Sequence, residues 1–134
     1  MNALDLANSL LAQRGRLVDT LDPELGLHPL RDAVRALFEA SARGGRPAAG
    51  DIARLNRLAT APSLAWDAAG PHLTAETAEV EAARTAIELL ASGRIRACGN
   101  PRCVQFFLAE GRREFCSATC ANRTRVARHA ARHR

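Results

Sequence analysis

The chain has 134 residues and a formal net charge of +5. Of its residues, 47% are hydrophobic but only 4% are aromatic. It contains no lysine, so its 19 lysine-or-arginine residues are all arginine. This length fits one domain, or a small domain followed by a metal-stabilised segment. The alanine- and leucine-rich composition suits packed helices better than a β-sandwich. No apolar run approaches the roughly 18 residues that a membrane span needs, and the residues after Met1 lack the pattern of a signal peptide. We therefore expect a mainly α protein of the reducing cytoplasm.

The first predicted element is a helix from Leu4 to about Gln13, because its leucines fall on one broad helical stripe. Asp5 and Asn8 lie three residues apart on this helix. They either line a polar pocket or make local hydrogen bonds that dock the helix. Residues 19–24 (DTLDPE) have the composition of a turn.

The second predicted helix begins near Pro29 and ends at Gly44 and Gly45. Apolar residues recur along it with helical spacing, so one of its faces is predicted to be core and the other solvated. The core face comprises Leu30, Val34, Leu37, Phe38 and Ser41, and the solvated face comprises Arg31, Asp32, Arg35 and Glu39.

Three further elements follow in the N-terminal part of the chain. A short helix is predicted from Asp51 to about Thr60, with its apolar side chains inward. A small β-hairpin is predicted at residues 64–66 and 72–73, with Trp66 as a buried anchor. A helix over residues 74–92 is then followed by a short extended link at residues 94–96. The residues predicted to be buried in the two helices are Ile52, Leu55, Leu58, Val80, Ala83, Ile87 and Leu90.

Four cysteines form two close pairs, C-x4-C and C-x3-C. Such pairs supply the four thiolates of a tetrahedral structural zinc site, which leaves no open position for catalysis. We also weighed a disulfide framework, inert thiols and an iron–sulfur cluster, but a reducing compartment and this spacing favour zinc. The predicted ligands of one zinc ion are Cys98, Cys103, Cys116 and Cys120.

The residues around the cysteines predict a treble-clef-like finger. Residues 106–108 and 112–115 are predicted to form a hairpin across a glycine turn. Ser117 suits the N-cap of a final helix, which would carry Cys120 in its first turn.

This segment resembles the CGNR zinc finger, a bacterial family in which the finger follows a helical ABATE domain and which is presumed to regulate transcription. The resemblance implies domains at residues 1–93 and 94–134, with Ser9 in place of the usual threonine and Ala121 in place of the signature glycine. It rests in the finger on residues 98–103 (CGNPRC), 106–107 (FF) and 113–123 (REFCSATCANR), and upstream on residues 4–9 (LDLANS), Leu30, Arg31, Val34, Arg35, Leu55 and Asn56.

Charge divides the chain at the start of this segment. From Arg94 onward ten arginines face only two glutamates, whereas the preceding part is net acidic. A single-signed patch of this kind is typical of a protein that binds a polyanion, although it also fits a solvated, frayed C-terminus. The predicted nucleic-acid contacts are Arg112 and Arg113 of the hairpin, with Arg123, Arg125, Arg128 and Arg132 of the final helix.

On the final helix Arg125, Arg128 and Arg132 share one outward arc with His129. Val126 and the alanines at 127, 130 and 131 are predicted to face the metal and the hairpin. We expect a DNA-binding regulator and no enzyme, since no catalytic constellation accompanies the committed thiols. The alternative is a structural-zinc module that binds a partner protein or senses a small molecule. A homodimer and an effector are compatible with either reading, and the sequence identifies neither.

Overall fold

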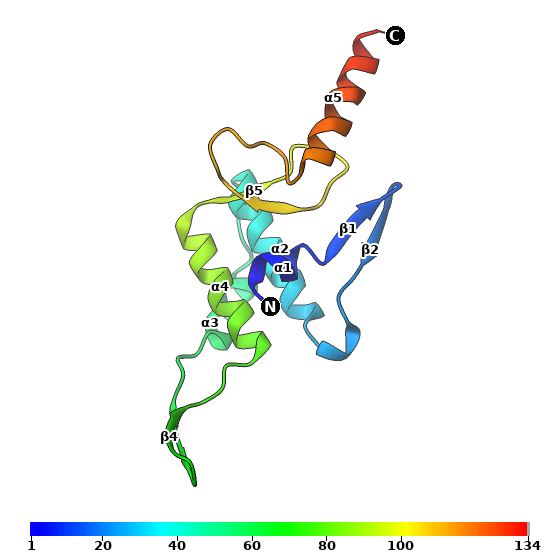
Figure 1. The fold of residues 1–134 in the computed structure, drawn as a ribbon. Helices are drawn as coiled ribbons and strands as arrows, with labels where there is room; N and C mark the ends of the chain where they lie inside the picture. Colours follow the sequence, from blue (N-terminus) through cyan, green and yellow to red (C-terminus); the bar gives the residue numbers. More distant parts are fainter. Residues whose placement is uncertain (134) are drawn as a thin grey trace.

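The computed structural model describes residues 1–133, which form helices and three separate two-stranded antiparallel sheets (Figure 1). The N-terminal helical part is joined to a short sheet and a loop region from which the C-terminal helix projects. The elements are α1 (Ala3–Ala7), β1 (Leu10–Gln13), β2 (Arg16–Asp19), the 3₁₀ helix η1 (Pro23–Leu25), α2 (His28–Arg43), α3 (Ala49–Leu58), β3 (Leu64–Asp67), β4 (Gly70–Leu73), α4 (Ala78–Ser92), β5 (Ile95–Ala97), β6 (Phe106–Leu108) and α5 (Ala118–Arg132).

One hydrophobic core joins α1, α2 and α4 to the sheet formed by β5 and β6. Phe38 of α2 is fully buried and meets Phe106 of β6 edge-on, with ring centroids 5.6 Å apart. Ile95 of β5 is also fully buried in the same cluster. The hydrophobic core therefore continues past residue 93, where the resemblance divides the chain into two domains.

The first predicted helix is only half correct. Helix α1 ends at Ala7, and residues 10–19 form a β-hairpin instead, with Leu11 opposite Val18. The turn explains the change, because Arg14 and Gly15 both have positive φ angles, of 50° and 76°. Two such residues build the tight hairpin turn that matches the twist of paired strands. The leucines of a short apolar run fit either period, so turn chemistry decides.

Helix α2 has the predicted bounds, but its solvated face is wrong in part. Arg31 is only 6% exposed and Arg35 is half-buried, while Ser41 on the predicted core face is exposed. Arg31 donates a 2.7 Å hydrogen bond to the carboxylate of Asp19, and this bond is the main reason that the pKa of Asp19 falls to about 2. Helical periodicity locates apolar side chains, but it does not reveal that an arginine is buried against a hydrogen-bond acceptor from another part of the chain.

Helices α3 and α4 are present with nearly the predicted bounds, but of their predicted core residues only Leu55 and Ala83 are fully buried. Leu55 is buried, whereas Ile52 is 43% exposed. The buried residues of α4 are Ala82, Ala83 and Ala86, and its larger Val80, Ile87 and Leu90 are only half-buried. Small side chains in the centre let α4 pack closely on its neighbours.

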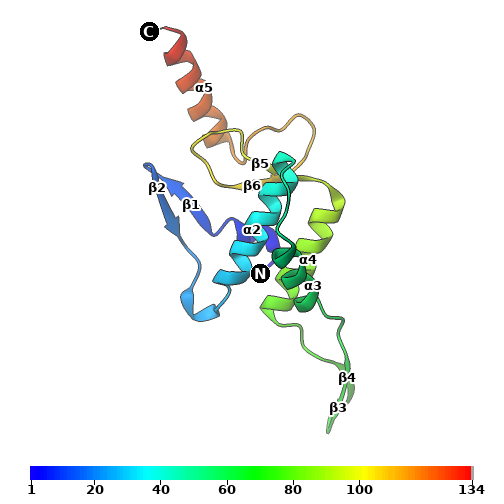
Figure 2. The same cartoon turned by 180° about the vertical axis from the view of Figure 1, so that it is seen from behind.

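The β3–β4 hairpin is confirmed, but Trp66 is not a buried anchor. The hairpin projects away from the helices (Figures 1 and 2), and Trp66 is 74% exposed. Leu64 pairs with Leu73, and Trp66 pairs with Pro71, so one face of this hairpin is apolar. Among the helices of residues 1–133, none is both long enough and apolar enough to cross a bilayer.

Candidate metal centre

Strand pairing brings the first two cysteines together. Strands β5 and β6 pair with Ala97 opposite Phe106, and the loop between them carries Cys98 and Cys103. The predicted hairpin between residues 106–108 and 112–115 is wrong, because β6 pairs with the upstream strand and residues 112–115 form no strand. The predicted extended link at residues 94–96 supplies most of β5 and thus gives β6 its partner.

The second pair of cysteines lies at the start of α5. Ser117 is the N-cap of this helix, as predicted, and its hydroxyl accepts a hydrogen bond from the backbone N–H of Cys120. Cys116 precedes the cap and Cys120 lies in the first turn. The neighbouring Ala121 is in the same turn, where alanine favours the helix more than the glycine of the signature.

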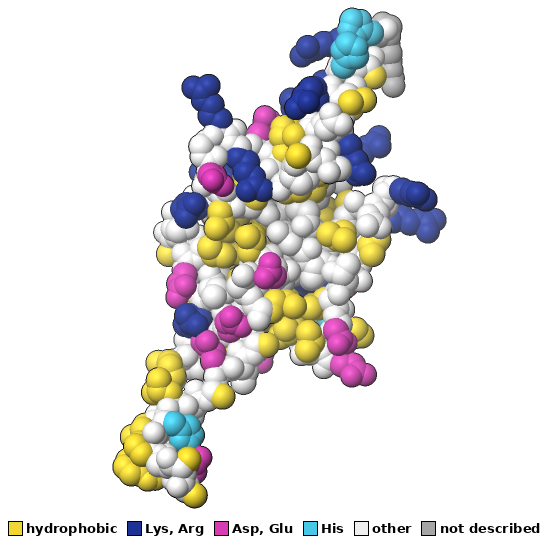
Figure 3. All heavy atoms as spheres, viewed as in Figure 1, with side chains coloured by type: hydrophobic (Ala, Val, Ile, Leu, Met, Phe, Trp, Pro, Cys, Tyr) yellow, Lys and Arg dark blue, Asp and Glu magenta, His cyan; other side chains and the backbone are white. Residues whose placement is uncertain are grey.

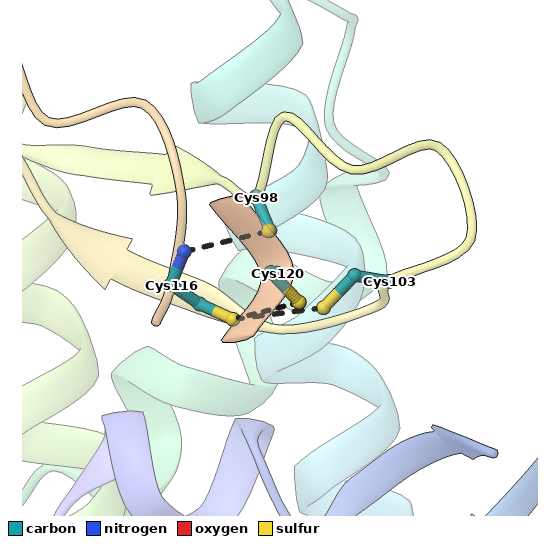
Figure 4. Close-up of side chains that lie close together, drawn as sticks. All are labelled: Cys98, Cys103, Cys116 and Cys120. Atoms are coloured by element: carbon teal, nitrogen blue, oxygen red, sulfur yellow. Dashed lines mark hydrogen bonds between the residues drawn. The ribbon is translucent and has the colours of Figure 1, made fainter. Parts of the chain in front are cut away.

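The four sulfur atoms converge on one point (Figure 4) and lie within 4.8 Å of one another. The Sγ of Cys116 is 3.7 Å from that of Cys103 and 3.7 Å from that of Cys120. These distances exclude a disulfide, whose sulfurs lie about 2.05 Å apart. They match the edge of a tetrahedron with metal–sulfur bonds of about 2.3 Å, which is roughly 3.8 Å. The donor set therefore fits a tetrahedral thiolate-bound zinc ion.

Backbone groups around the sulfurs support this centre. The N–H of Gln105 donates to the Sγ of Cys103, and the N–H of Cys116 donates to the Sγ of Cys98, each at 3.4 Å. Such bonds orient and stabilise ligating thiolates. Gly99 is needed for close approach, because a Cβ there would lie 3.0 Å from the carbonyl oxygen of Glu114.

The thiols of this cluster differ in the direction of their pKa shifts. Burial raises the pKa of the Cys103 thiol to about 11, and burial likewise raises the pKa of Cys116. The pKa of the Cys120 thiol is lowered instead, because its hydrogen bonds outweigh the effect of burial. Cys103 and Cys116 therefore keep their protons at neutral pH unless a cation lies beside them. A bound zinc ion supplies the positive charge that makes them thiolates.

Comparison with known families agrees with this geometry. A model of the CGNR zinc finger matches residues 94–133, and a model of the ABATE family, described as "Putative stress-induced transcription regulator", matches residues 2–93. The chain belongs to the ABATE family. Its CGNR finger holds one structural zinc ion through the cysteine cluster. A search of curated proteins finds no match.

Asn8 connects the ABATE segment to the CGNR finger. Its side-chain oxygen accepts from the N–H of Phe106 at 2.8 Å, and its amide nitrogen donates to the carbonyl of Phe106 at 2.9 Å. Asp5 is exposed and its backbone N–H is capped by Asn2. Of the two polar residues predicted on the first helix, Asn8 therefore binds the finger, whereas Asp5 is exposed to solvent.

Arg35 and Gln105 complete this junction, and neither was predicted to have a structural role. Arg35 donates to the carbonyls of Ala7 at 2.6 Å and Val104 at 2.9 Å, and its guanidinium lies 5.1 Å from the centre of the Phe106 ring. Gln105 donates to the carbonyl of Leu10 at 2.7 Å. The only sign of this structural role in the sequence is that Arg35 is one of the residues that resemble the family, since its position on the helix predicted a solvated side chain.

The C-terminal arginines of the ABATE protein are well exposed on α5. Every residue from Arg125 to His133 is exposed, including Val126 at 59%. The prediction that Val126 and the alanines face the metal and hairpin is therefore wrong, because α5 projects beyond the body after Thr124 (Figure 1). Arg134, the last of the ten arginines, lies outside the described residues.

The arginines of the CGNR finger that are predicted to contact DNA differ in how far they interact with other groups of the protein. Arg112 and Arg123 are exposed. Arg113 donates to the carbonyls of Phe115 and Cys116, and its guanidinium lies 4.8 Å from the centre of the Phe107 ring. Arg128 approaches Glu114 at 3.9 Å in a surface pair, which contributes little. Figure 3 shows the basic side chains gathered toward the α5 end, with most acidic side chains of this face over the helical part.

Proposed function

We propose that this protein is a DNA-binding transcription regulator whose helix α5 enters the major groove of its target. The observation that carries this proposal is the projection of the end of α5, where residues 125–132 are all exposed and rich in arginine. A zinc ligand in the first turn fixes the root of this helix, so its free end has a defined direction. This arrangement also supports a treble-clef-like class for the finger.

The size and charge of the projecting segment suit a DNA groove. An α-helix with its side chains is about 10–12 Å in diameter, which fits the major groove with its width of about 12 Å. The exposed part of α5 extends about 12 Å along its axis, at 1.5 Å per residue. The segment from Arg94 onward has ten arginines against two glutamates. It stays strongly positive after the charge of about −2 of a zinc ion with four thiolates is included.

The arginines divide into different roles. Arg125, Arg128 and Arg132 share one arc of α5 and would read base edges, since arginine pairs with guanine in two hydrogen bonds. Arg112 and Arg123 would contact phosphates. Arg113 is committed to the finger backbone and supports the fold of the loop. This proposal assigns no catalytic role to any residue.

A truncation tests the proposal without exposing the core. Residues 125–133 are all exposed, so removal of residues 125–134 takes away no residue of the described core. The truncation should abolish binding to duplex DNA while zinc content and thermal stability are kept. The zinc-loaded full chain is titrated against random and selected duplex DNA, duplex RNA and heparin at several salt concentrations. Equal affinity for all four polyanions, or DNA binding unchanged by the truncation, would contradict the proposal.

A second candidate function, binding of a small apolar effector, is favoured by a groove between α2, α3 and α4. Its volume is about 350 Å³, and Leu37, Ile52 and Leu90 give it an apolar lining. Ser41 and Asn56 add polar groups that could orient a ligand. Partial filling by Leu90→Trp should abolish binding of an apolar fluorescent probe. Probe binding that this variant leaves unchanged would rule the groove out.

A further inference from the structure

The β1–β2 hairpin is held firmly at its base on both strands. Gln105 of the finger donates to Leu10 of β1, and Arg31 of α2 bonds to Asp19 of β2, each at 2.7 Å. Thr20 closes the base through two hydrogen bonds to the carbonyl of Ser9. Isolated two-stranded hairpins are marginally stable in water, so these anchors give the hairpin a fixed direction. It projects toward the same end of the molecule as α5 (Figures 1 and 2).

The tip of this hairpin carries two exposed positive charges. Arg14 and Arg16 are exposed, and within residues 1–133 neither forms an ion pair. The carboxylate of the hairpin, Asp19, is already paired at the base with Arg31 and His28. The positive charge at the tip is therefore not neutralised by its own strands.

Arginine is not the residue that best stabilises the turn at position 14. Arg14 has a φ of 50°, and among the described residues it is the non-glycine residue with positive φ. This position of a two-residue turn favours Asn, Asp or Gly. A less favourable residue held by well-anchored surroundings indicates a functional site.

We propose that the β1–β2 hairpin is a second DNA-binding arm, whose Arg14 and Arg16 contact the phosphate backbone beside the groove that α5 occupies. This inference rests on the proposed function. Each strand of four residues extends roughly 13 Å, so the tip stands away from the helical part, at about the level where α5 begins (Figures 1 and 2). Because the hairpin base is bonded to Gln105, directly before β6, and α5 is rooted in the same finger, the two arms keep a fixed spacing. Phosphate contacts of this kind set the register of a protein on DNA without reading its sequence.

The test is a double variant that keeps the hairpin folded. Arg14→Asn creates the favoured Asn-Gly turn, and Arg16→Thr places a good strand former in β2. Both charges are lost while hairpin formation is favoured, so a loss of affinity cannot come from unfolding of the hairpin. The matched control is Arg54→Gln with Arg57→Gln on α3, which lies across the helical part from the hairpin (Figures 1 and 2).

The zinc-loaded full-length variants are titrated against a selected duplex at several salt concentrations. We expect the hairpin variant to lose on the order of tenfold in affinity, and its salt slope to fall by about two units, for two lost phosphate contacts. Its preference for selected over random DNA should not change, and the control pair should bind like the wild type. A hairpin variant with wild-type affinity and slope, or a control pair that loses as much, would overturn the inference. If the wild type itself shows no binding to duplex DNA, the proposed function fails instead.

Discussion

Asn8 is a residue whose side chain satisfies both backbone groups of a residue in another part of the chain. Its amide bonds the N–H and the carbonyl of Phe106, which is only 3% exposed. Asn8→Ala leaves both of these groups without their partner, so we expect a loss of about 2–3 kcal/mol in the free energy of unfolding. Urea denaturation of the zinc-loaded chain measures this loss.

The matched control is Asn56→Ala, which removes an exposed amide from α3 and should change stability by less than about 0.5 kcal/mol. Asn8→Asp is informative as well, because it keeps the acceptor for the N–H but places a carboxylate against the carbonyl. It should be at least as destabilising as Asn8→Ala. An Asn8→Ala variant as stable as the control would show that the junction is not held by this side chain.

At the scale of single residues, the sequence predicts side chains whose chemistry is local. The four cysteines and the Ser117 cap follow from spacing and from the needs of a metal or a helix end, and the structure brings them together as predicted. Arg31 and Arg35 could not be placed in this way. Their partners lie on the β1–β2 hairpin, at the end of α1 and in the finger loop, and a helical pattern does not encode distant acceptors.

At the scale of elements, the β3–β4 hairpin is the clearest case in which the element was predicted correctly but its burial was not. Its strands are where the turn residues predict them, but it extends into solvent and Trp66 is 74% exposed. We expect Trp66→Ala to change the free energy of unfolding by less than about 0.5 kcal/mol. Phe38→Ala, which removes a fully buried aromatic ring, should cost about 3–5 kcal/mol.

Intrinsic fluorescence provides a second measurement, because Trp66 is the single tryptophan. Its emission should be that of a solvent-exposed indole and should be quenched by iodide. A protected indole, together with a large loss of stability in Trp66→Ala, would mean that the apolar face of this hairpin is covered in solution. Sedimentation at increasing protein concentration would then show whether a second copy covers it.

The N-terminal part contains two β-hairpins, of which the sequence predicted one and missed the other because their turns differ. The β3–β4 turn has glycine and proline between short apolar runs, a strong turn signal. The β1–β2 turn offers only Arg14 and Gly15, which read as the exposed end of a helix. Hydrogen bonds to the finger, through Gln105 and Asn8, add to the positive φ angles of this turn in favouring the hairpin.

At the scale of the whole molecule, the zinc centre and the helical core are coupled. Ile95 and Phe106 flank the cysteine loop and are both buried in the core shared with α2. The sequence cannot reveal this continuity, because the family segments meet at residue 93 and each has its own pattern. Loss of the metal should therefore affect more than the C-terminal segment.

Cys116→Ser tests this coupling directly. Zinc binding by a four-cysteine site stabilises folding by roughly 10–16 kcal/mol in small domains, which is comparable with the total stability of a domain of this size. Without the metal, the loop between β5 and β6 loses its cross-link, and Ile95 and Phe106 lose the register that buries them. We expect lower helicity than the loss of α5 alone explains, and loss of hydrogen-exchange protection in α1 and α2. Ser117→Ala, which removes the cap but no ligand, should cost only about 1 kcal/mol and keep zinc. If Cys116→Ser releases zinc and yet leaves protection in α2 at the wild-type level, the two parts fold independently and the shared core contributes little.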